Sequence, residues 1–134
     1  MNVPATTKSY GYRKEGCVFC SIPKDCLIAE SELAFVIRDT YPVTKLHTLI
    51  IPKRHVETFF EMEQAEVKAC VQLINKQKMG IEAADNAVDG FNIGINNGQS
   101  AGQEICHCHI HLIPRRTGDV DAPMGGVRHV IPGK

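Results

Sequence analysis

The sequence predicts an α+β fold in which an antiparallel sheet of about five strands packs against one main amphipathic helix. Short apolar runs with strand-like composition lie on both sides of a single helical stretch. No second crossover helix separates the last two runs, which argues against a doubly wound sheet. The chain has 134 residues, 43% of them hydrophobic. That is enough for one sizeable core, so we expect a single domain over residues 1–134.

The first half of the chain supplies three of the predicted strands. Residues 1–15 are polar and unpatterned, so we expect a loosely ordered arm there. Apolar runs around 27–28 and over 33–37 are typical of two paired strands. Residues 46–51 (LHTLII) contain the strand-favouring residues Thr and Ile and are stopped by a proline, which predicts a buried strand.

The second half begins with the helix and continues with two strands. Apolar residues recur at near-helical spacing within 61–84, at Val67, Cys70, Val71, Ile74 and Ile81. Residues 91–96 alternate strictly, which places Phe91, Ile93 and Ile95 on a core face. A glycine-bearing polar loop follows at 97–103. The tail over 117–134 is dense in Gly and Pro, so we expect it to be irregular.

A second alternating run, over 105–114, carries three closely spaced histidines. As a strand it would place His107, His109 and His111 on one face and Cys106 and Cys108 on the other. Three imidazoles on one face indicate a metal site, a polar catalytic surface or a tag-like accident. They would fan along about 13 Å, which is awkward for one metal ion unless other strands contribute ligands.

Composition and charge exclude several classes of function. Fifteen Lys plus Arg balance fifteen Asp plus Glu, so no basic surface indicates nucleic-acid binding, and any anion site must be local. No apolar run reaches the roughly 18 to 20 residues of a membrane span, and the N-terminal segment lacks the apolar core of a signal peptide. We therefore expect a cytoplasmic protein with neither a membrane nor a specific nucleic acid as partner.

The six cysteines favour metal binding or core packing over a disulfide framework. Cys17 and Cys20 form a Cys-x-x-Cys turn, which supplies half of a tetrahedral zinc site. A redox dithiol or unligated core thiols are the alternatives, but a redox pair normally heads a helix in a βαβ context that is absent here. The remaining four show no ligand spacing and are expected in the core: Cys26, Cys70, Cys106 and Cys108.

The run His107-Cys108-His109-Ile110-His111-Leu112-Ile113 resembles the signature of the histidine triad family of nucleotide hydrolases and transferases. Other segments match in order along the chain. HTLIIPKRH at 47–55 is similar to the family's strand ending in Pro-Lys-x-His, and Asn96 with 101–103 resembles its phosphate-side loop. Downstream, IPRR at 113–116, Gly118-Asp119 and GGVR at 125–128 resemble the bacterial dinucleoside polyphosphate hydrolase-like branch.

The resemblance implies a covalent mechanism on the triad. His109 would attack the α-phosphorus of a dinucleoside polyphosphate or a nucleoside phosphoramidate, giving a nucleotidyl-histidine. His111 would donate hydrogen bonds to the phosphate oxygens. The leaving group would take its proton from a neighbouring histidine. His107 is the third member of the triad. Gln103 and the backbone amides of 102–104 would stabilise charge on the phosphoryl oxygens.

The same resemblance assigns nucleotide-binding roles to a second set of residues. Asn96 fits the family's nucleotide-side amide, and Gly102 belongs to its phosphate loop. Asp39 fits its ribose-hydroxyl acceptor, although an Asp before a strand can also be a turn former. Glu104 stands where many members carry Ser or Thr. A carboxylate there would repel phosphate unless it points away, binds a cation or is protonated.

The zinc-bearing members imply a structural site and a dimer. The positions matching His55 and His107 would complete a Cys2His2 zinc site with the Cys-x-x-Cys turn, and a homodimer would extend the sheet. A compact zinc finger is excluded, because the four ligands span far more than about 30 residues. His47 could hydrogen-bond behind the site or simply pack. Arg115 and Arg116 could form a solvated rim or attract polyphosphate.

The alternative function is a noncatalytic, zinc-stabilised module that binds a nucleotide or a protein partner. Binding residues can persist without turnover, and the intact middle histidine argues against this interpretation.

Overall fold

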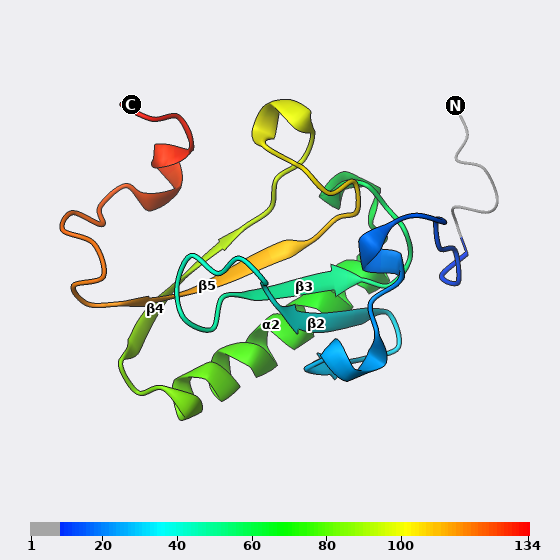
Figure 1. Cartoon of the computed structure of the whole chain (residues 1–134), viewed down its shortest axis with the longest axis horizontal. Coiled ribbons are helices and arrows are strands. Elements are labelled where there is room, and N and C mark those ends of the chain that lie inside the picture. Colours follow the sequence, from blue (N-terminus) through cyan, green and yellow to red (C-terminus); the bar gives the residue numbers. More distant parts are fainter. Residues whose placement is uncertain (1–8) are drawn as a thin grey trace.

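The computed structural model describes residues 9–134, and within them a five-stranded antiparallel sheet runs in the order β1-β2-β3-β5-β4 (Figure 1). The long helix α2 lies across one face of this sheet, which confirms the predicted α+β class. The strands and the helix are β1 (Ala29–Glu30), β2 (Ala34–Arg38), β3 (Thr48–Pro52), α2 (Gln64–Ala84), β4 (Val88–Gly94) and β5 (Ile110–Arg116). Short 3-10 helices are η1 (Val18–Cys20), η2 (Lys24–Cys26), η3 (Phe59–Glu61), η4 (Gln99–Ala101) and η5 (Gly126–Val130).

Strands β2 and β3 are buried on both faces of the sheet, and β2 shows why. Its even-numbered residues Ala34 and Val36 pack with the apolar stripe of α2, whereas Phe35 and Ile37 pack with the segment around η1 on the opposite face. Side chains alternate across a strand, so a strand covered on both sides reads as a continuous apolar run. This explains why the two central strands were recognisable in the sequence.

Helix α2 begins three residues later than predicted, because a separate turn, η3, precedes it. The backbone N–H of Glu63, at the N-cap, donates to the Glu66 carboxylate at 2.9 Å. Glu66 is fully buried and also accepts two hydrogen bonds from the Arg54 guanidinium, at 2.9 and 2.7 Å. A buried carboxylate needs such partners, so this pair fixes the start of α2 against the segment that follows β3.

The last strand differs from its prediction over 105–114. Strand β5 begins at Ile110, and the backbone amides of His107 and Cys108 donate to Ile105 and Val56 instead of to a neighbouring strand. His107 and His109 therefore precede the strand, and only His111 lies in it. The prediction that all three histidines share one strand face is wrong, because these hydrogen bonds draw the backbone away from the ladder before Ile110.

Strand β4 lies at the edge of the sheet and is shifted relative to the predicted 91–96, because it pairs with β5 from Val88 to Gly94. Phe91 and Ile95 pack against the core as predicted, but Ile93 is 52% exposed. The reason is position: α2 covers mainly β2 and β3 and leaves part of the edge strand open (Figure 1).

The predicted core cysteines divide into two pairs. Cys70 and Cys108 are buried as expected, but Cys26 and Cys106 are exposed because they lie in turns outside both core clusters. None of the helices described within 9–134 has the length and apolarity needed to cross a bilayer.

The two ends of the chain were predicted to be irregular. Residues 1–8 of the predicted arm lie outside the described residues, while Tyr10 and Tyr12 are hydrogen-bonded to Glu63 and His55. The tail over 117–134 contains only the short turn η5 among its described elements. The single-domain organisation over 1–134 stays a prediction.

Candidate functional site

Two cysteines and two histidines from three separate segments meet in one cluster, which we call the Cys/His cluster: Cys17, Cys20, His55 and His107. One ligand atom from each lies within 4.8 Å of the others. Nδ1 of His107 is 3.4 Å from the Sγ of Cys17 and 3.5 Å from that of Cys20. Tetrahedral zinc would hold its nitrogen and sulfur ligands about 3.6 Å apart, so the four donors already have suitable spacing.

The backbone around His107 determines which ring nitrogen can bind a metal. Nε2 of His107 lies 2.8 Å from the Pro52 carbonyl oxygen, which can only accept, so Nε2 carries the proton. The lone pair is then on Nδ1, facing the two cysteines. Burial lowers the pKa of His107 to about 4, so the ring is neutral at pH 7 and suited to coordination.

His55 completes the Cys/His cluster through its own Nδ1, which lies 3.4 Å from the Cys20 Sγ. Burial also lowers the pKa of His55. The backbone N–H of His55 donates to the backbone carbonyl oxygen of Tyr12. The Tyr12 ring also packs edge-on against the His55 imidazole, with ring centroids 6.0 Å apart. The neighbouring residue, Arg54, forms the buried pair with Glu66, so the start of α2 anchors this ligand.

His109 is oriented by the residue that belongs to the Cys/His cluster. Its Nδ1 donates to the carbonyl oxygen of His107 at 2.7 Å, which leaves Nε2 of a neutral ring with a lone pair. Phe19, which lies between Cys17 and Cys20 in the chain, packs edge-on against the His109 ring at 5.0 Å. The turn that carries the two thiols therefore also forms one wall of the site around His109.

A second cluster, the Asp/His cluster, consists of Asp39, His47 and His111 at the adjoining ends of β2, β3 and β5. The backbone N–H of Val43 donates to Nδ1 of His47 at 3.1 Å, so the His47 proton lies on Nε2. That Nε2 is 2.9 Å from Nδ1 of His111 and 3.4 Å from the Asp39 carboxylate. His111 accepts at Nδ1 and is left with an Nε2–H donor.

Protonation separates this cluster from a metal site, although three potential ligand atoms are close together in it. Nε2 of His47 carries a proton as long as Val43 donates to Nδ1, so it cannot also offer a lone pair to a cation. Burial lowers the pKa of His47, and it lowers that of His111 to about 4. At neutral pH the cluster is therefore a chain of hydrogen bonds between two neutral rings, ending in a donor.

The predicted phosphate loop is held together by the Gln103 side chain. Its Oε1 accepts from the Gly98 N–H at 2.8 Å, and its Nε2 donates to the Glu57 carbonyl at 2.6 Å and the Ile105 carbonyl at 3.1 Å. Gly102 has φ of 88°, a conformation that favours glycine, and lies beside the Asn96 amide. Glu104 is exposed. The structure thus brings Asn96, Gly102 and Gln103 together and ties Gln103 to backbone groups of the loop.

Sequence reasoning left His47 undecided between packing and hydrogen bonding, and it did not identify Phe19 as part of the site. Both depend on contacts between distant segments: His47 with His111, and Phe19 with His109. The position of His47 immediately before a buried strand was the available sign that it lies close to the site. The sequence spacing could not show that its partner is His111.

A protein-family model described as "HIT domain" matches residues 22–118. An uncharacterized HIT-like protein, MJ0866, from Methanocaldococcus jannaschii is 37% identical over 124 residues, covering 85% of this chain and 91% of that protein. Adenylylsulfatase HINT3 from Arabidopsis thaliana is 40% identical over 107 residues, covering 77% of this chain and 54% of that protein.

Solved structures agree with the sequence relatives. A Zn-bound histidine triad family protein from Mycobacterium smegmatis superposes with a TM-score of 0.70 at 34% identity, covering 78% of each chain. Plasmodium falciparum diadenosine triphosphate hydrolase gives 0.69 at 25% identity, covering 75% of this chain and 68% of that one.

Proposed function

The chain belongs to the histidine triad (HIT) family, and on this premise we propose that it cleaves nucleotides at the α-phosphate through a covalent nucleotidyl-histidine at His109. One observation carries the proposal. The hydrogen bond from Nδ1 of His109 to the His107 carbonyl leaves Nε2 as the nucleophilic nitrogen of a neutral ring. An adenylylsulfatase and a diadenosine triphosphate hydrolase among the similar proteins support nucleotide anhydrides as the substrate class.

The proposed reaction has two balanced steps. Nε2 of His109 forms a bond to the α-phosphorus while the bond from phosphorus to the leaving oxygen breaks, and the leaving phosphate or sulfate departs as an anion. Water then forms a bond to phosphorus as the phosphorus–nitrogen bond breaks. The water proton goes to solvent, and His109 returns to its neutral form. The Nδ1–H of His109 stays on the His107 carbonyl throughout, so His107 acts as a positioning residue.

His111 is proposed as the donor to the phosphoryl oxygens. Nδ1 of His111 accepts a hydrogen bond from His47, which places the His111 proton on Nε2. This donor is therefore already oriented before the substrate binds. With its pKa lowered to about 4, His111 is almost entirely neutral at pH 7 and has no imidazolium proton to give to a leaving group. This favours phosphate or sulfate leaving groups, which need no proton, over an amine, which needs one.

The nucleotide-binding roles remain proposals of the same kind. Asp39 would accept a ribose hydroxyl beside His111, since its carboxylate lies 3.9 Å from Nδ1 of that ring. Asn96 and the loop amides from Gly102 to Glu104 would face the phosphate. The Gln103 side chain is hydrogen-bonded to backbone groups of the loop, so we propose that Gln103 holds the loop amides in place.

We further propose that the Cys/His cluster binds one structural zinc ion. The donor set supports it: two thiols and two neutral imidazoles whose ligand atoms all lie within 4.8 Å of one another. The Zn-bound relative supports the same metal. Zinc there would join the N-terminal turn to the segment that carries His109.

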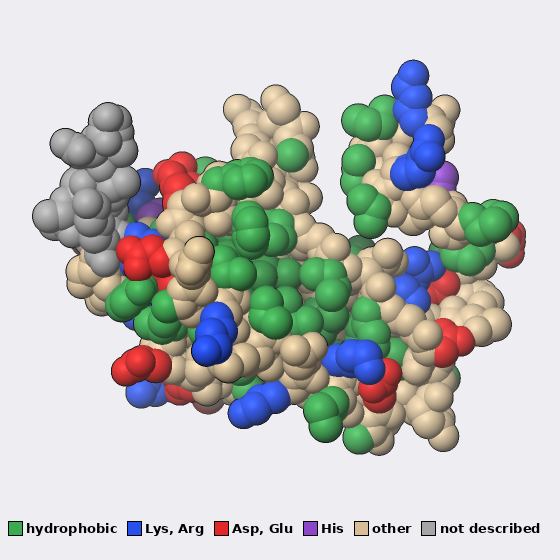
Figure 2. All heavy atoms as spheres, turned by 180° about the vertical axis from the view of Figure 1, so that it is seen from behind, with side chains coloured by type: hydrophobic (Ala, Val, Ile, Leu, Met, Phe, Trp, Pro, Cys, Tyr) green, Lys and Arg blue, Asp and Glu red, His purple; other side chains and the backbone are tan. Residues whose placement is uncertain are grey.

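We also propose a homodimer that continues the sheet through the edge of β4. Ile93 on this strand is 52% exposed, and Met79 on α2 is 69% exposed. Figure 2 shows hydrophobic side chains gathered over the face that is turned away in Figure 1, where α2 lies. An uncovered edge next to an apolar surface favours self-association. Light scattering at micromolar concentration tests this, and Ile93→Lys should shift the protein to a monomer; a monomeric wild type would contradict the proposal.

The decisive test of the reaction is to trap the intermediate. The protein is mixed with diadenosine triphosphate, quenched without acid and mapped by mass spectrometry. We expect one nucleoside monophosphate adduct, on His109. An adduct on another residue, or nucleotide binding with neither adduct nor turnover, would overturn the proposal and favour the noncatalytic binding module.

A further inference from the structure

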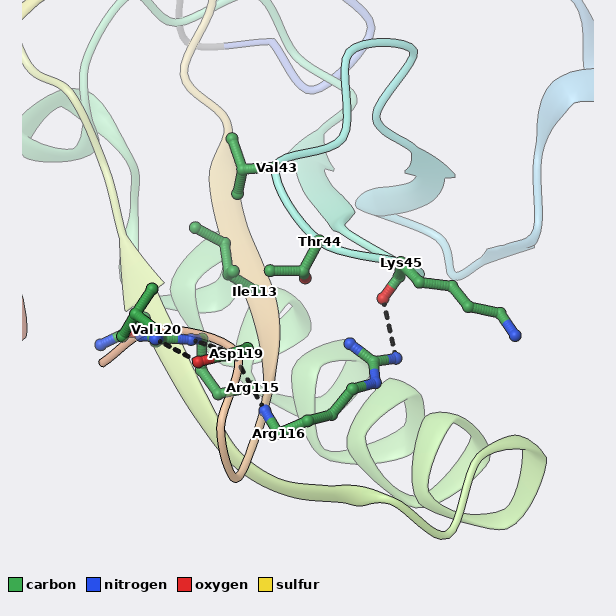
Figure 3. Close-up of a pocket in the computed structure, with 9 residues that line it drawn as sticks. Val43, Thr44, Lys45, Ile113, Arg115, Arg116, Asp119 and Val120 are labelled. Carbon is green, nitrogen blue, oxygen red and sulfur yellow. Dashed lines mark hydrogen bonds and ion pairs between the residues drawn. The ribbon is translucent and has the colours of Figure 1, made fainter. Parts of the chain in front are cut away.

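The loop at 43–45, between β2 and β3, lies next to the Asp/His cluster (Figure 3). Val43 and Lys45 are exposed. Together with parts of β4, β5 and the tail, the loop lines a groove of about 630 Å³. The loop is therefore held in place by hydrogen bonds more than by packing, and these bonds decide where its backbone groups point.

The loop sets the proton position of His47. The Val43 N–H donates to Nδ1 of His47 at 3.1 Å, and the Thr44 carbonyl oxygen accepts from the His47 backbone N–H at 3.1 Å. Burial lowers the pKa of His47, so the ring is neutral and carries its proton on one nitrogen only. As long as the Val43 N–H points at Nδ1, that nitrogen is Nε2.

The Asp39 carboxylate does not select this proton position by itself. It lies 3.4 Å from Nε2 of His47 and 3.9 Å from Nδ1 of His111, so it can accept a hydrogen bond from either ring. With the His47 proton moved to Nδ1, Nε2 would accept from Nδ1–H of His111. His111 would then turn a lone pair, instead of a donor, toward the proposed phosphate position. The direction of the donor chain thus depends on the Val43 N–H.

The first anchor of the loop is the Thr44 side chain. Its Oγ1 donates to the carbonyl oxygen of Pro114 on β5 at 2.8 Å. The pairing of β3 with β5 ends at Leu112, so the Thr44 hydroxyl serves a carbonyl that lies beyond the end of this ladder. Thr44 thereby joins the loop to the strand that carries His111.

The second anchor is the Arg116 side chain. Its Nη2 donates to the Lys45 carbonyl oxygen at 3.1 Å (Figure 3) and to the Asp85 carboxylate at 3.0 Å. Its Nε donates to the same carboxylate at 3.2 Å, at the C-cap of α2. Two of the three guanidinium nitrogens are therefore committed to the fold instead of to a polyphosphate.

Leu46, which closes the loop, has a strained backbone. Its φ of 72° is in the left-handed region, which is unfavourable for a residue with a Cβ atom. Such a conformation persists only where the surrounding contacts hold it. Loss of an anchor would let Leu46 relax, and the backbone at Val43 would move relative to His47 because Leu46 lies between them in the chain.

We propose that Thr44, supported by Arg116, is a positioning residue for the Asp/His cluster. Its hydroxyl anchors the loop to β5 and so keeps the Val43 N–H on His47. This keeps the Nε2–H of His111 directed at the phosphoryl oxygens. Thr44 acts through the loop backbone and not by contact with the reacting atoms. The catalytic consequence rests on the proposed function, whereas the proton position does not.

Nitrogen NMR of the histidine rings tests the proton position without substrate. Wild type should show His47 with its proton on Nε2 alone. Thr44→Val keeps the shape of the side chain and removes the hydroxyl, so it should show a mixture of both tautomers, and Thr44→Ser should restore the wild-type spectrum. Arg116→Leu should act in the same direction as Thr44→Val. Thr117→Val is the matched control, because the Thr117 hydroxyl is bonded to Asp89, outside the loop.

Kinetics with diadenosine triphosphate test the catalytic consequence. Thr44→Val should lower kcat about tenfold and change KM much less, because the misdirected His111 donor is needed mainly in the transition state. Thr44→Ser and Thr117→Val should keep the wild-type kcat. Zinc content should be the same in all variants, since the loop is separate from the Cys/His cluster.

The outcomes separate this proposal from the proposed function. A single Nε2–H tautomer in both Thr44→Val and Arg116→Leu would overturn it, as would a mixture in Thr44→Ser or Thr117→Val. A wild type that forms the His109 adduct, together with a Thr44→Val variant of mixed tautomer and unchanged kcat, would also overturn it. If the mixture appears as expected but wild type forms no adduct, the positioning by Thr44 stands and the proposed function fails.

Discussion

The Cys/His cluster and the Asp/His cluster lie on either side of His109 and are built from similar parts, yet they hold their protons differently. In the first, the Pro52 carbonyl accepts a hydrogen bond from Nε2–H of His107, so Nδ1 has a lone pair directed at two thiols. In the second, the Val43 N–H donates to His47 and keeps a proton on Nε2, directed at His111. One backbone group per ring thus decides whether the neighbouring atoms can hold a cation or form a donor chain.

The comparison also shows how the two clusters are connected. His107 faces the thiols with its side chain and orients His109 with its carbonyl oxygen. His109 in turn lies against His111, with ring centroids 5.2 Å apart. Damage to the Cys/His cluster should therefore affect stability first and activity as a consequence, whereas damage to the Asp/His cluster should affect activity and leave metal content unchanged.

The largest effect is expected between the clusters, at His109 itself. His109→Asn should lower kcat/KM by at least about 10³-fold, roughly 4 kcal/mol in the barrier, because an amide cannot form the covalent intermediate. Metal content and melting temperature should stay close to wild type. Steady-state kinetics with diadenosine triphosphate checks the rate, and near-normal turnover would refute the nucleophilic role.

The next effect concerns the Cys/His cluster. Cys17→Ser/Cys20→Ser should abolish zinc binding and remove several kcal/mol of stability, lowering the melting temperature by more than about 10 °C. The matched control is Cys26→Ser/Cys106→Ser, which changes two exposed thiols and should alter neither quantity. Metal analysis and thermal denaturation of untagged protein provide both readouts. Equal zinc content in the two double variants would contradict the assignment.

Acid should expose the difference in protonation. His111 has a folded pKa of about 4, below its ordinary value of 6.5, so the unfolded state binds more protons as the pH falls. Its contribution to the free energy of unfolding is present above about pH 6.5 and is lost progressively toward pH 4, at most about 3 kcal/mol. Urea unfolding at several pH values, compared with His111→Asn, measures this. The variant should lose less stability in that window; an identical pH dependence would argue against a buried neutral His111.

The smallest effect is expected at His47, behind His111. His47→Asn should lower kcat/KM about tenfold, because His111 loses the donor that orients its proton. Zinc content should not change. Nitrogen NMR of His111 should show a mixture of tautomers in the variant, a signature that simple loss of packing would not produce. His129→Asn, in the exposed tail, is the control. An unchanged tautomer with reduced activity would mean that His47 only packs.

The sequence by itself determined the layered α+β class, the helix and the two buried central strands. Those features follow from local periodicity, since a strand covered on both faces and a helix covered on one leave patterns in consecutive residues. The chemical types at the site were readable for the same reason: the Cys-x-x-Cys turn and the three histidines are local.

Only the tertiary structure decided what each of these residues does. Strand β5 begins at Ile110 rather than residue 105, because hydrogen bonds to Ile105 and Val56 draw the backbone away from the sheet. Ile93 is exposed because α2 lies over other strands. The proton positions of His47, His107 and His109 depend on backbone groups, which for His107 lie 55 residues away at Pro52, and those contacts exist only after folding. Local pattern sets residue type and element, whereas long-range hydrogen bonds set protonation and geometry.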